Sequence, residues 1–314
     1  MNIIDKLKKA NLKGRGGACF PTYLKWESVL NAKAFKKYII CNAAEAELDF
    51  KKDKYILEHF LEDVLNGIKI ALKTIPKSSA FIYLNKNYYP IFKERIKEEK
   101  ITLIEGDNKY IGGEETALIN FIEEKIAIPK KKPPYVSEKG LFNMPTLVNN
   151  VETFYYTSKI EKGEYQNERF YMVLGKGIDD HILELKSNTT IREILKEVKI
   201  PFPYYIQAGG VLGEILEEKD FDRVLECTGL MRVIAYSEDP YLVMEEWAEF
   251  LTNGNCDKCT PCREGTHRIL EMVRKREIEK LEELFLALEK TSFCALGKGI
   301  PIPFRSLIKK ICLK

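Results

Sequence analysis

The chain has 314 residues, of which 45% are hydrophobic and 31% charged, which is ordinary for a folded globular protein. Its formal net charge is only +3, so it lacks the strong positive field that would indicate nucleic-acid binding. No segment approaches the ~18 consecutive apolar residues of a membrane-spanning helix, and the charged N-terminus lacks the apolar core of a secretory signal. We therefore expect a cytoplasmic protein of about two or three domains that contacts a membrane only through partners.

Residues 1 to about 164 alternate between short apolar runs and longer helical patterns. A short amphipathic helix is indicated by Ile3, Ile4 and Leu7. Strands are predicted over 38–41, 80–84 and 101–104, and helices over 53–73, over 89–97 and from about 114. Strands that alternate with helices favour a mostly parallel sheet, whose ligands bind beyond the carboxyl ends of the strands.

The pattern changes at about residue 165 and again at about 239. A strand pair over 170–174 and 182–185, a capping box at Thr190 and Glu193, and strands over 204–207 and 232–236 predict a small α+β domain. Helices are then predicted over 243–251 and 264–275, with a final amphipathic helix through Ile278, Leu281, Phe285 and Leu288. The fold class is therefore α/β, and the expected domains are 1–164, 165–238 and 239–314.

The eight cysteines carry the first chemical signal. In a reducing compartment, closely spaced cysteines are more often metal ligands than disulfide partners. Cys256, Cys259 and Cys262 form a C-x2-C-x2-C run, and Cys294 follows at some distance, a spacing that suits four thiolates around an iron–sulfur cluster. Structural zinc, with His267 as a spare ligand, is the first alternative, and unligated core cysteines are the second.

The remaining cysteines lack such spacing. They are interpreted as small buried hydrophobic residues, and they are Cys19, Cys41, Cys227 and Cys312.

Two glycine-rich turns could hold phosphate through their backbone N–H groups. The first contains Gly14, Arg15, Gly16 and Gly17, where Arg15 would add positive charge, and the second spans 110–116. Either segment alone is as well explained as a flexible turn. The polar cluster of Asn149, Asn150 and Thr153 could serve a flavin's polar edge or could simply cap a helix.

Two pairs of acidic residues follow predicted strands: Glu45 with Glu47, and Glu114 with Glu115. Beside a nucleotide they could accept hydrogen bonds from ribose hydroxyls or the nicotinamide amide, and they would repel an extra 2′-phosphate. The competing explanation for these acidic residues is that they lie at helix N-termini, where the helix dipole stabilises a carboxylate.

Taken together, these segments resemble the NADH-binding flavoprotein subunit of respiratory complex I. That family includes the matching subunits of NAD-linked hydrogenases and formate dehydrogenases. The matching stretches are GRGGACFPTYLKW (14–26), CNAAEAE (41–47), YIGGEETALINFIE (110–123), KPPY (132–135), PTLVNNVETF (145–154), CDKCTPCREG (256–265) and SFCALG (292–297).

The resemblance implies a Rossmann-like FMN domain, a ubiquitin-like β-grasp (SLBB) insert and a C-terminal helical bundle around a 4Fe–4S cluster. It assigns FMN contacts to Gly14, Arg15, Gly16, Gly17, Lys25, Asn42, Gly113, Asn149, Asn150 and Thr153. It assigns NADH contacts to Phe20, Glu45, Glu47, Tyr110, Glu114, Glu115 and Tyr135, and the cluster to the four cysteines.

The resemblance also implies a function. Hydride would pass from NADH to FMN, and single electrons would leave through the cluster, without a side-chain acid or base. The expected partners are a thioredoxin-like 2Fe–2S subunit and a larger iron–sulfur subunit, in a complex that could sit on the cytoplasmic face of the inner membrane.

The chain departs from the family pattern at several positions. Ala44 and Ala46 replace an acid and a hydroxyl, Cys19 and Tyr23 stand where glycines are usual, and Ser28 replaces an aromatic residue. Ala44, Ala46 and Ser28 favour an alternative in which ferredoxin or flavodoxin, rather than NADH, reduces the flavin. A second alternative is a non-catalytic subunit that only transfers electrons or has a structural role. The intact GRGG and Asn149-Asn150 segments argue against it.

Overall fold

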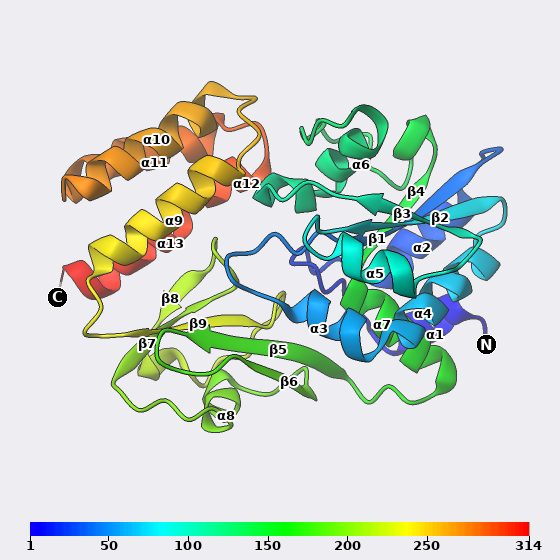
Figure 1. Ribbon diagram of the computed structural model, residues 1–314, viewed down its shortest axis with the longest axis horizontal. Helices are drawn as coiled ribbons and strands as arrows, with labels where there is room; N and C mark the ends of the chain where they lie inside the picture. The colour runs from blue at the N-terminus through cyan, green and yellow to red at the C-terminus, as the bar shows by residue number, and fades with distance from the viewer. Residues whose placement is uncertain (314) are drawn as a thin grey trace.

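The computed structural model describes residues 1–313 and contains two β-sheets and a C-terminal group of helices (Figure 1). The first sheet has four strands in the order β3-β2-β1-β4, and the second has five in the order β6-β5-β9-β7-β8. The C-terminal helices, yellow to red in Figure 1, lie beside the second sheet.

Every strand pair of the first sheet is parallel. Its strands are β1 (Lys37–Ala43), β2 (Ser78–Leu84), β3 (Ile101–Glu105) and β4 (Thr146–Asn150). The first three were predicted, and β4 was not. The central strand β1 is largely buried, as expected for a parallel sheet covered on both faces.

Helices of the N-terminal half cover this sheet (Figure 1). They are α1 (Ile3–Lys9), α2 (Thr22–Asn31), α3 (Lys52–His59), α4 (Leu61–Thr74), α5 (Tyr89–Arg95), α6 (Glu115–Glu124) and α7 (Val151–Lys162). The prediction of one helix over 53–73 was wrong, because the chain breaks at Phe60, which has φ −132° and ψ 31°. The Phe60 ring packs against Tyr155 and Phe170, with ring centroids 5.1 and 6.0 Å away.

The second sheet is mixed, with an antiparallel β5–β6 pair and a parallel β5–β9 pair. Its elements are β5 (Glu168–Gly175), β6 (His181–Lys186), α8 (Ile191–Lys196), β7 (Tyr204–Ala208), β8 (Glu214–Leu216) and β9 (Leu230–Ala235). The predicted capping box is present at the start of α8, where Thr190 and Glu193 bond each other's backbone N–H groups. Strand β8 was not predicted.

The C-terminal helices are α9 (Pro240–Gly254), α10 (Thr260–Arg274), α11 (Leu281–Thr291), α12 (Ala295–Gly299) and α13 (Pro301–Leu307). They share a core that includes Trp247, Phe285 and Phe304. The prediction that the helix through residues 278–288 is the last was wrong, since α12 and α13 follow it. Pro301 begins α13, where its missing N–H costs no helical hydrogen bond.

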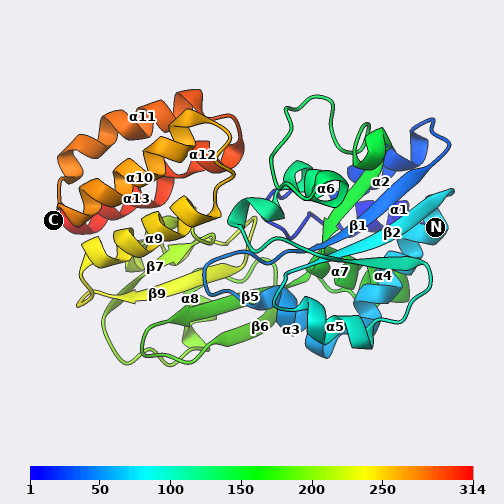
Figure 2. The ribbon, with the colours of Figure 1, turned by 45° about the horizontal axis from the view of Figure 1, so that its top comes forward.

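The segment between β1 and α3 joins the three groups of elements. Figure 2 shows it leaving the first sheet and running toward the second sheet and α9. Within this segment Glu47 accepts hydrogen bonds from the Tyr110 hydroxyl and the Val211 N–H, each at 2.9 Å. Among residues 1–313, no helix is long and apolar enough to cross a membrane.

Candidate functional site

The carboxyl ends of β1 and β4 bring three asparagines together. Asn42 pairs in register with Asn150, and Cys41 pairs with Asn149. The Asn42 amide donates to the Gly113 carbonyl at 2.9 Å, which joins the second glycine turn to this edge. The sheet thus places all of these predicted residues where parallel α/β sheets bind ligands.

The Asn149 side chain is engaged within the protein. In the amide orientation that satisfies its hydrogen bonds, it accepts from the indole N–H of the buried Trp26 at 3.0 Å. It therefore supports the end of β4 from the interior.

The first glycine turn closes on itself over the start of α7. The Gly14 N–H donates to the Phe20 carbonyl at 2.9 Å, and the Arg15 N–H donates to the Thr153 hydroxyl at 3.1 Å. A Cβ at Gly16 would lie 3.2 Å from the Cβ of Asn150, so only glycine permits this approach without a shift. Close backbone contact with a helix start is the geometry of a phosphate-binding turn.

The side chain of Arg15 does not point along this turn. It is buried, and its Nη2 donates to the Tyr165 hydroxyl, the Glu168 carbonyl and the Ser187 hydroxyl at 3.3, 3.2 and 3.0 Å. Tyr165 lies in the loop before β5, Glu168 begins β5, and Ser187 directly follows β6. Arg15 therefore shapes the turn with its main chain and ties it to the second sheet with its side chain.

A buried charge network lies beneath the turn and was missed by the sequence analysis. Lys52 Nζ lies 2.6 Å from Asp53 and 2.8 Å from Glu152, and the Asn150 amide donates to Asp53 at 2.5 Å. Burial alone would lower the pKa of Lys52, but the two carboxylates outweigh it and raise that pKa. The signal available in the sequence was the position of Lys52-Asp53 directly after the 41–47 stretch.

Glu45 caps the N-terminus of α3 by accepting hydrogen bonds from the N–H groups of Asp53 and Lys54. Burial, followed by the negative charge of Asp53, raises the pKa of Glu45 to about 8. Burial also raises the pKa of Glu47. Both predicted acids lie close to the carboxyl end of β1, and both are engaged by the protein itself.

The second pair of acids forms an ion-pair cluster with two lysines. Glu114 caps α6, and Lys132 Nζ lies 2.9 Å from both Glu114 and Glu115. Lys25 Nζ lies 2.9 Å from the other oxygen of Glu115. Burial pushes the pKa of Glu115 upward, but the two lysines outweigh it and lower that pKa. Lys132 was not predicted as a site residue, although it begins the KPPY stretch.

Two of the predicted aromatic residues are open to solvent. Phe20 is 46% exposed and Tyr135 is 56% exposed. Exposed rings are available to stack on a planar ligand. Tyr110, by contrast, is committed to Glu47.

The four cysteines of the predicted cluster lie around two helix starts. Cys259 immediately precedes α10, Cys262 lies in its first turn, Cys294 immediately precedes α12, and Cys256 lies in the preceding loop. Burial, followed by the nearby Cys259 and Cys294, raises the pKa of Cys262 to about 12. Bound iron would reverse this preference, because a coordinating thiol is deprotonated.

The donor set is four cysteine thiols, which is the set that a 4Fe–4S cluster uses. Among residues 1–313, the side chains form no ready-made group of three or more His, Cys, Asp or Glu that could hold a metal ion. The Ser292 hydroxyl beside Cys262 is buried and has no hydrogen-bond partner among the described residues, so a polar group fits there.

The interpretation of the other four cysteines as buried residues is confirmed for one of them and is wrong for three. Cys41 is buried, but Cys19, Cys227 and Cys312 are only half-buried. Cys19 and Cys227 lie on exposed turns, where packing alone does not account for them.

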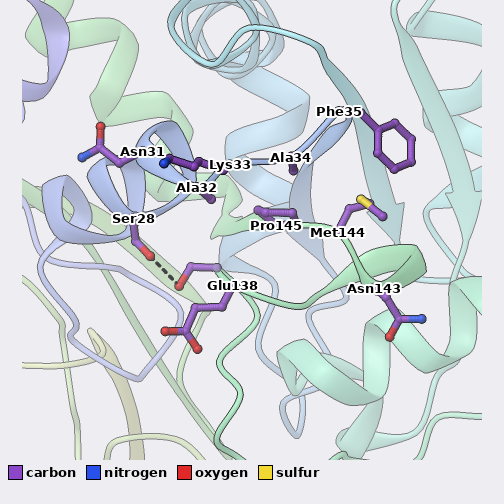
Figure 3. A pocket seen from close by; sticks show the side chains of 11 residues that line it. Ser28, Asn31, Ala32, Lys33, Ala34, Phe35, Glu138, Asn143, Met144 and Pro145 are labelled. Carbon is purple, nitrogen blue, oxygen red and sulfur yellow. Dashed lines mark hydrogen bonds between the residues drawn. The ribbon is translucent and has the colours of Figure 1, made fainter.

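A pocket of about 580 Å³ lies elsewhere, between the end of α2 and the amino ends of β1 and β4 (Figure 3). Its wall includes Phe35, Met144 and Pro145, and Ser28 and Ser137 share a 2.9 Å hydrogen bond there. It faces away from the carboxyl ends of the strands, so it is not part of the candidate site.

Comparison with known proteins gives two family matches. Residues 7–158 match the Nuo51 FMN-binding domain, and residues 242–311 match the NADH-ubiquinone oxidoreductase-F iron-sulfur binding region. The F subunit of the NADH-quinone oxidoreductase of Aquifex aeolicus is 33% identical, over 94% of this chain and 80% of that protein. The HndC subunit of the NADP-reducing hydrogenase of Solidesulfovibrio fructosivorans is 28% identical, over 97% and 73% respectively.

The fold also matches a solved structure. The chain superposes on an NAD+-reducing [NiFe]-hydrogenase in the H2-reduced state with a TM-score of 0.91 and 26% identity. The match covers 98% of this chain but only 60% of the hydrogenase chain. It confirms the α/β class with a parallel sheet and a helical C-terminal region.

Proposed function

Because the chain belongs to the family of NADH-quinone oxidoreductase F subunits, we propose that it is the electron-input subunit of an NADH:acceptor oxidoreductase complex. One observation carries the proposal: the chain matches both a flavin-binding and an iron–sulfur region. The structure places a glycine turn on a helix start in the first region, and four cysteines around two helix starts in the second.

The flavin would be held at the carboxyl edge of the first sheet. The backbone of the turn from Gly14 to Gly17 and the start of α7 would bind the phosphate, and Asn42 and Gly113 would line the ring. When bound, FMN supplies the conversion between two-electron hydride chemistry and one-electron transfer. The protein's part is to position the ring and exclude water, and the buried pairing of Lys52 with Glu152 keeps the floor of the site rigid.

The nicotinamide nucleotide would bind on the open side of the same cleft. Phe20 and Tyr135 offer exposed rings for stacking. Glu114 and Glu115 lie in this region and form ion pairs with Lys25 and Lys132, whereas burial raises the pKa values of Glu45 and Glu47. We propose NADH as the nucleotide, in line with the F-subunit relatives.

Electrons would leave through a 4Fe–4S cluster bound by Cys256, Cys259, Cys262 and Cys294. Two helix N-termini point at this site, and their dipoles favour the negative charge of a thiolate-bound cluster. The cluster would be the exit of this subunit toward its partners.

The wider assignments are also proposals. The partners would be a thioredoxin-like 2Fe–2S subunit and a larger iron–sulfur subunit, in the cytoplasm and attached to a membrane only through the complex. The eight cysteines, all free, are compatible with a reducing compartment. We propose domain boundaries at 164/165 and 238/239.

Anaerobic mixing of the FMN-reconstituted chain with NADH tests the proposal. The flavin absorption band should bleach within the mixing time, and dithionite should serve as a control for full reduction. Bleaching by dithionite but not by NADH would contradict an NADH-linked role.

A second candidate is a flavoprotein reduced by ferredoxin or flavodoxin. Ala44 and Ala46 favour it, because the acid and hydroxyl typical of the nicotinamide side are missing there. In the same apparatus, bleaching by reduced ferredoxin alone would support this candidate. Failure to bind any flavin would instead favour a non-catalytic subunit that transfers electrons or has a structural role.

A further inference from the structure

Two cysteines that are far apart in the sequence meet at the edge of the glycine turn. Cys19 belongs to the turn, and Cys227 lies in the loop before β9 of the second sheet. The Cys19 thiol donates to the carbonyl of Glu226, the residue before Cys227, at 3.1 Å, and the Cys227 thiol is near enough to raise the pKa of Cys19. Neither residue belongs to the cluster site at the starts of α10 and α12.

The backbone on both sides of this pair is constrained. Cys19 has φ +55°, a left-handed conformation that is uncommon for a residue with a Cβ and is often found at functional sites. Opposite it, Arg169 Nη1 donates to the carbonyls of Leu225 and Glu226 at 2.7 and 3.0 Å, which fixes the loop that carries Cys227. The segments that carry the two cysteines are therefore held in place by the protein.

The surroundings of the two cysteines set their accessibility and the rate at which they can react. Both cysteines are half-buried, so a small reagent can reach them. Arg169 is 1% exposed, and its Nε and Nη2 have no partner among the described residues, so buried donors remain beside the pair. Burial and then the neighbouring Cys227 raise the pKa of Cys19 to about 11, so Cys19 is a thiol at neutral pH and attacks a disulfide slowly.

We propose that Cys19 and Cys227 form a redox-active thiol pair that closes to a disulfide by exchange with a low-molecular-weight disulfide such as oxidised glutathione. One thiolate attacks the reagent, forms a mixed disulfide and releases one reduced thiol. The second thiolate then attacks the mixed disulfide, forms the Cys19–Cys227 bond and releases the other. The pair loses two electrons and two protons, and the reagent takes them up as two thiols.

This bond would join the glycine turn to the second sheet. Because the same turn would hold the flavin phosphate, the disulfide would fix one side of the proposed flavin site. The pairing itself does not depend on flavin or NADH binding.

The test uses the full chain reconstituted with FMN, iron and sulfide, and equilibrated anaerobically in glutathione buffers from fully reduced to fully oxidised. Free thiols are then blocked, and peptides are mapped by mass spectrometry without reduction. We expect a peptide containing Cys19 linked to one containing Cys227, which appears with oxidised glutathione and disappears with dithiothreitol. Iron content, measured in parallel, should stay constant, since the cluster cysteines take no part.

Two variants sharpen the result. Cys227→Ser should abolish the linked peptide and leave Cys19 with a glutathione adduct, whereas Cys312→Ser, at another half-buried cysteine, should retain the link. Absence of a Cys19–Cys227 peptide from the wild-type chain across the whole buffer series would overturn the proposal, as would separate glutathione adducts on the two residues. The wild-type measurement decides even if a variant fails to fold.

Discussion

At the candidate site, the effect of a single carboxylate on stability and of a single ring on binding can each be measured by one substitution. Glu45 both caps α3 and lies close to the negative charge of Asp53. The side chain of Phe20 is 46% exposed, so its removal should disturb little of the protein's own packing. The first residue therefore reports on stability and the second on binding.

Glu45 should make stability fall as pH rises. Its folded-state pKa is about 8, above the ordinary value of about 4.3, so between these values the folded state keeps a proton that the unfolded state has lost. Stability from this group is therefore present below pH ~4.3 and lost progressively toward pH 8. Urea midpoints at pH 5 and pH 8 should differ less in Glu45→Gln than in wild type. The exposed Glu279→Gln should behave as wild type, and equal pH dependence in all three would contradict the assignment.

Phe20→Ala should weaken NADH binding with little change in structure. Loss of one aromatic stacking contact is worth ~0.5–1.5 kcal/mol, which corresponds to an increase in KM of about twofold to thirteenfold. Phe35→Ala is the matched control, because Phe35 is 78% exposed but lies beside the pocket at the opposite edge of the sheet. Equal KM values for the two variants would remove Phe20 from the nucleotide site.

Ser292→Ala should lower the reduction potential of the cluster. The Ser292 hydroxyl is buried without a partner among the described residues, and a Cβ on Gly297 would lie 2.6 Å from it and 3.4 Å from the Cys262 Cβ. A hydroxyl that donates to a cluster sulfur stabilises the reduced state, so its removal shifts the potential downward. A redox titration followed by electron paramagnetic resonance measures the shift. Thr291→Ala, whose hydroxyl bonds the Ala287 carbonyl instead, should leave the potential unchanged.

At the level of elements, close helix packing is what positions the glycine turn. The start of α7 lies under the turn, and α4 packs against α7 at Gly67. A Cβ at position 67 would overlap the Phe154 carbonyl, so the two helices approach at backbone distance.

Gly67→Ala should destabilise the protein although it improves helix propensity. Alanine gains up to ~1 kcal/mol over glycine in a helix, but overpacking typically costs ~1–3 kcal/mol and the overlap here is with rigid backbone. We expect a net loss of about 1–2 kcal/mol in the free energy of unfolding, measured by urea denaturation. The exposed Lys73→Ala in the same helix should stay within about 0.5 kcal/mol of wild type. Stabilisation by Gly67→Ala would show that the helices can separate.

Local patterns in the sequence predicted those elements whose cause is local. The capping box at Thr190 and Glu193 is one example, since both partners lie within one turn. The break at Phe60 could not be predicted, because its cause is packing on Tyr155 and Phe170 from later in the chain. Strand β4 was missed because residues 145–150 were interpreted as a ligand motif.

The same distinction applies to the site. The cysteine loop was predicted from its spacing, and the flavin contacts of the glycine turn were predicted from the family resemblance. Lys132 and Lys52 were missed, because their significance lies in tertiary pairs with Glu115 and Glu152. The side-chain direction of Arg15 was equally inaccessible, since its partners come from the second sheet.

For the whole molecule, the cluster would act as a cross-link within the C-terminal helices. Cys294 connects the start of α12 to the loop and helix that carry the other three ligands. Beyond it, α13 is held independently, because the Ser306 hydroxyl accepts from the Ile215 N–H at 2.9 Å.

Cys294→Ser should lower iron content and loosen only part of the molecule. Amide hydrogen exchange should speed up in the cysteine loop, the first turn of α10 and α12, while β1 to β4 keep their protection. Cys312→Ser, which removes a cysteine outside the cluster, should keep full iron. Normal iron content in Cys294→Ser would exclude this residue as a ligand.

Arg15 connects the glycine turn to the second sheet. Its main chain forms part of the glycine turn, and its side chain anchors that turn to β5 and the end of β6. The binding of the flavin and the packing of the second sheet against the turn are therefore thermodynamically linked. Each equilibrium must strengthen the other by the same factor. A partner protein that docks on this sheet would tighten the cofactor without touching it, so that assembly itself would decide when the cofactor stays bound.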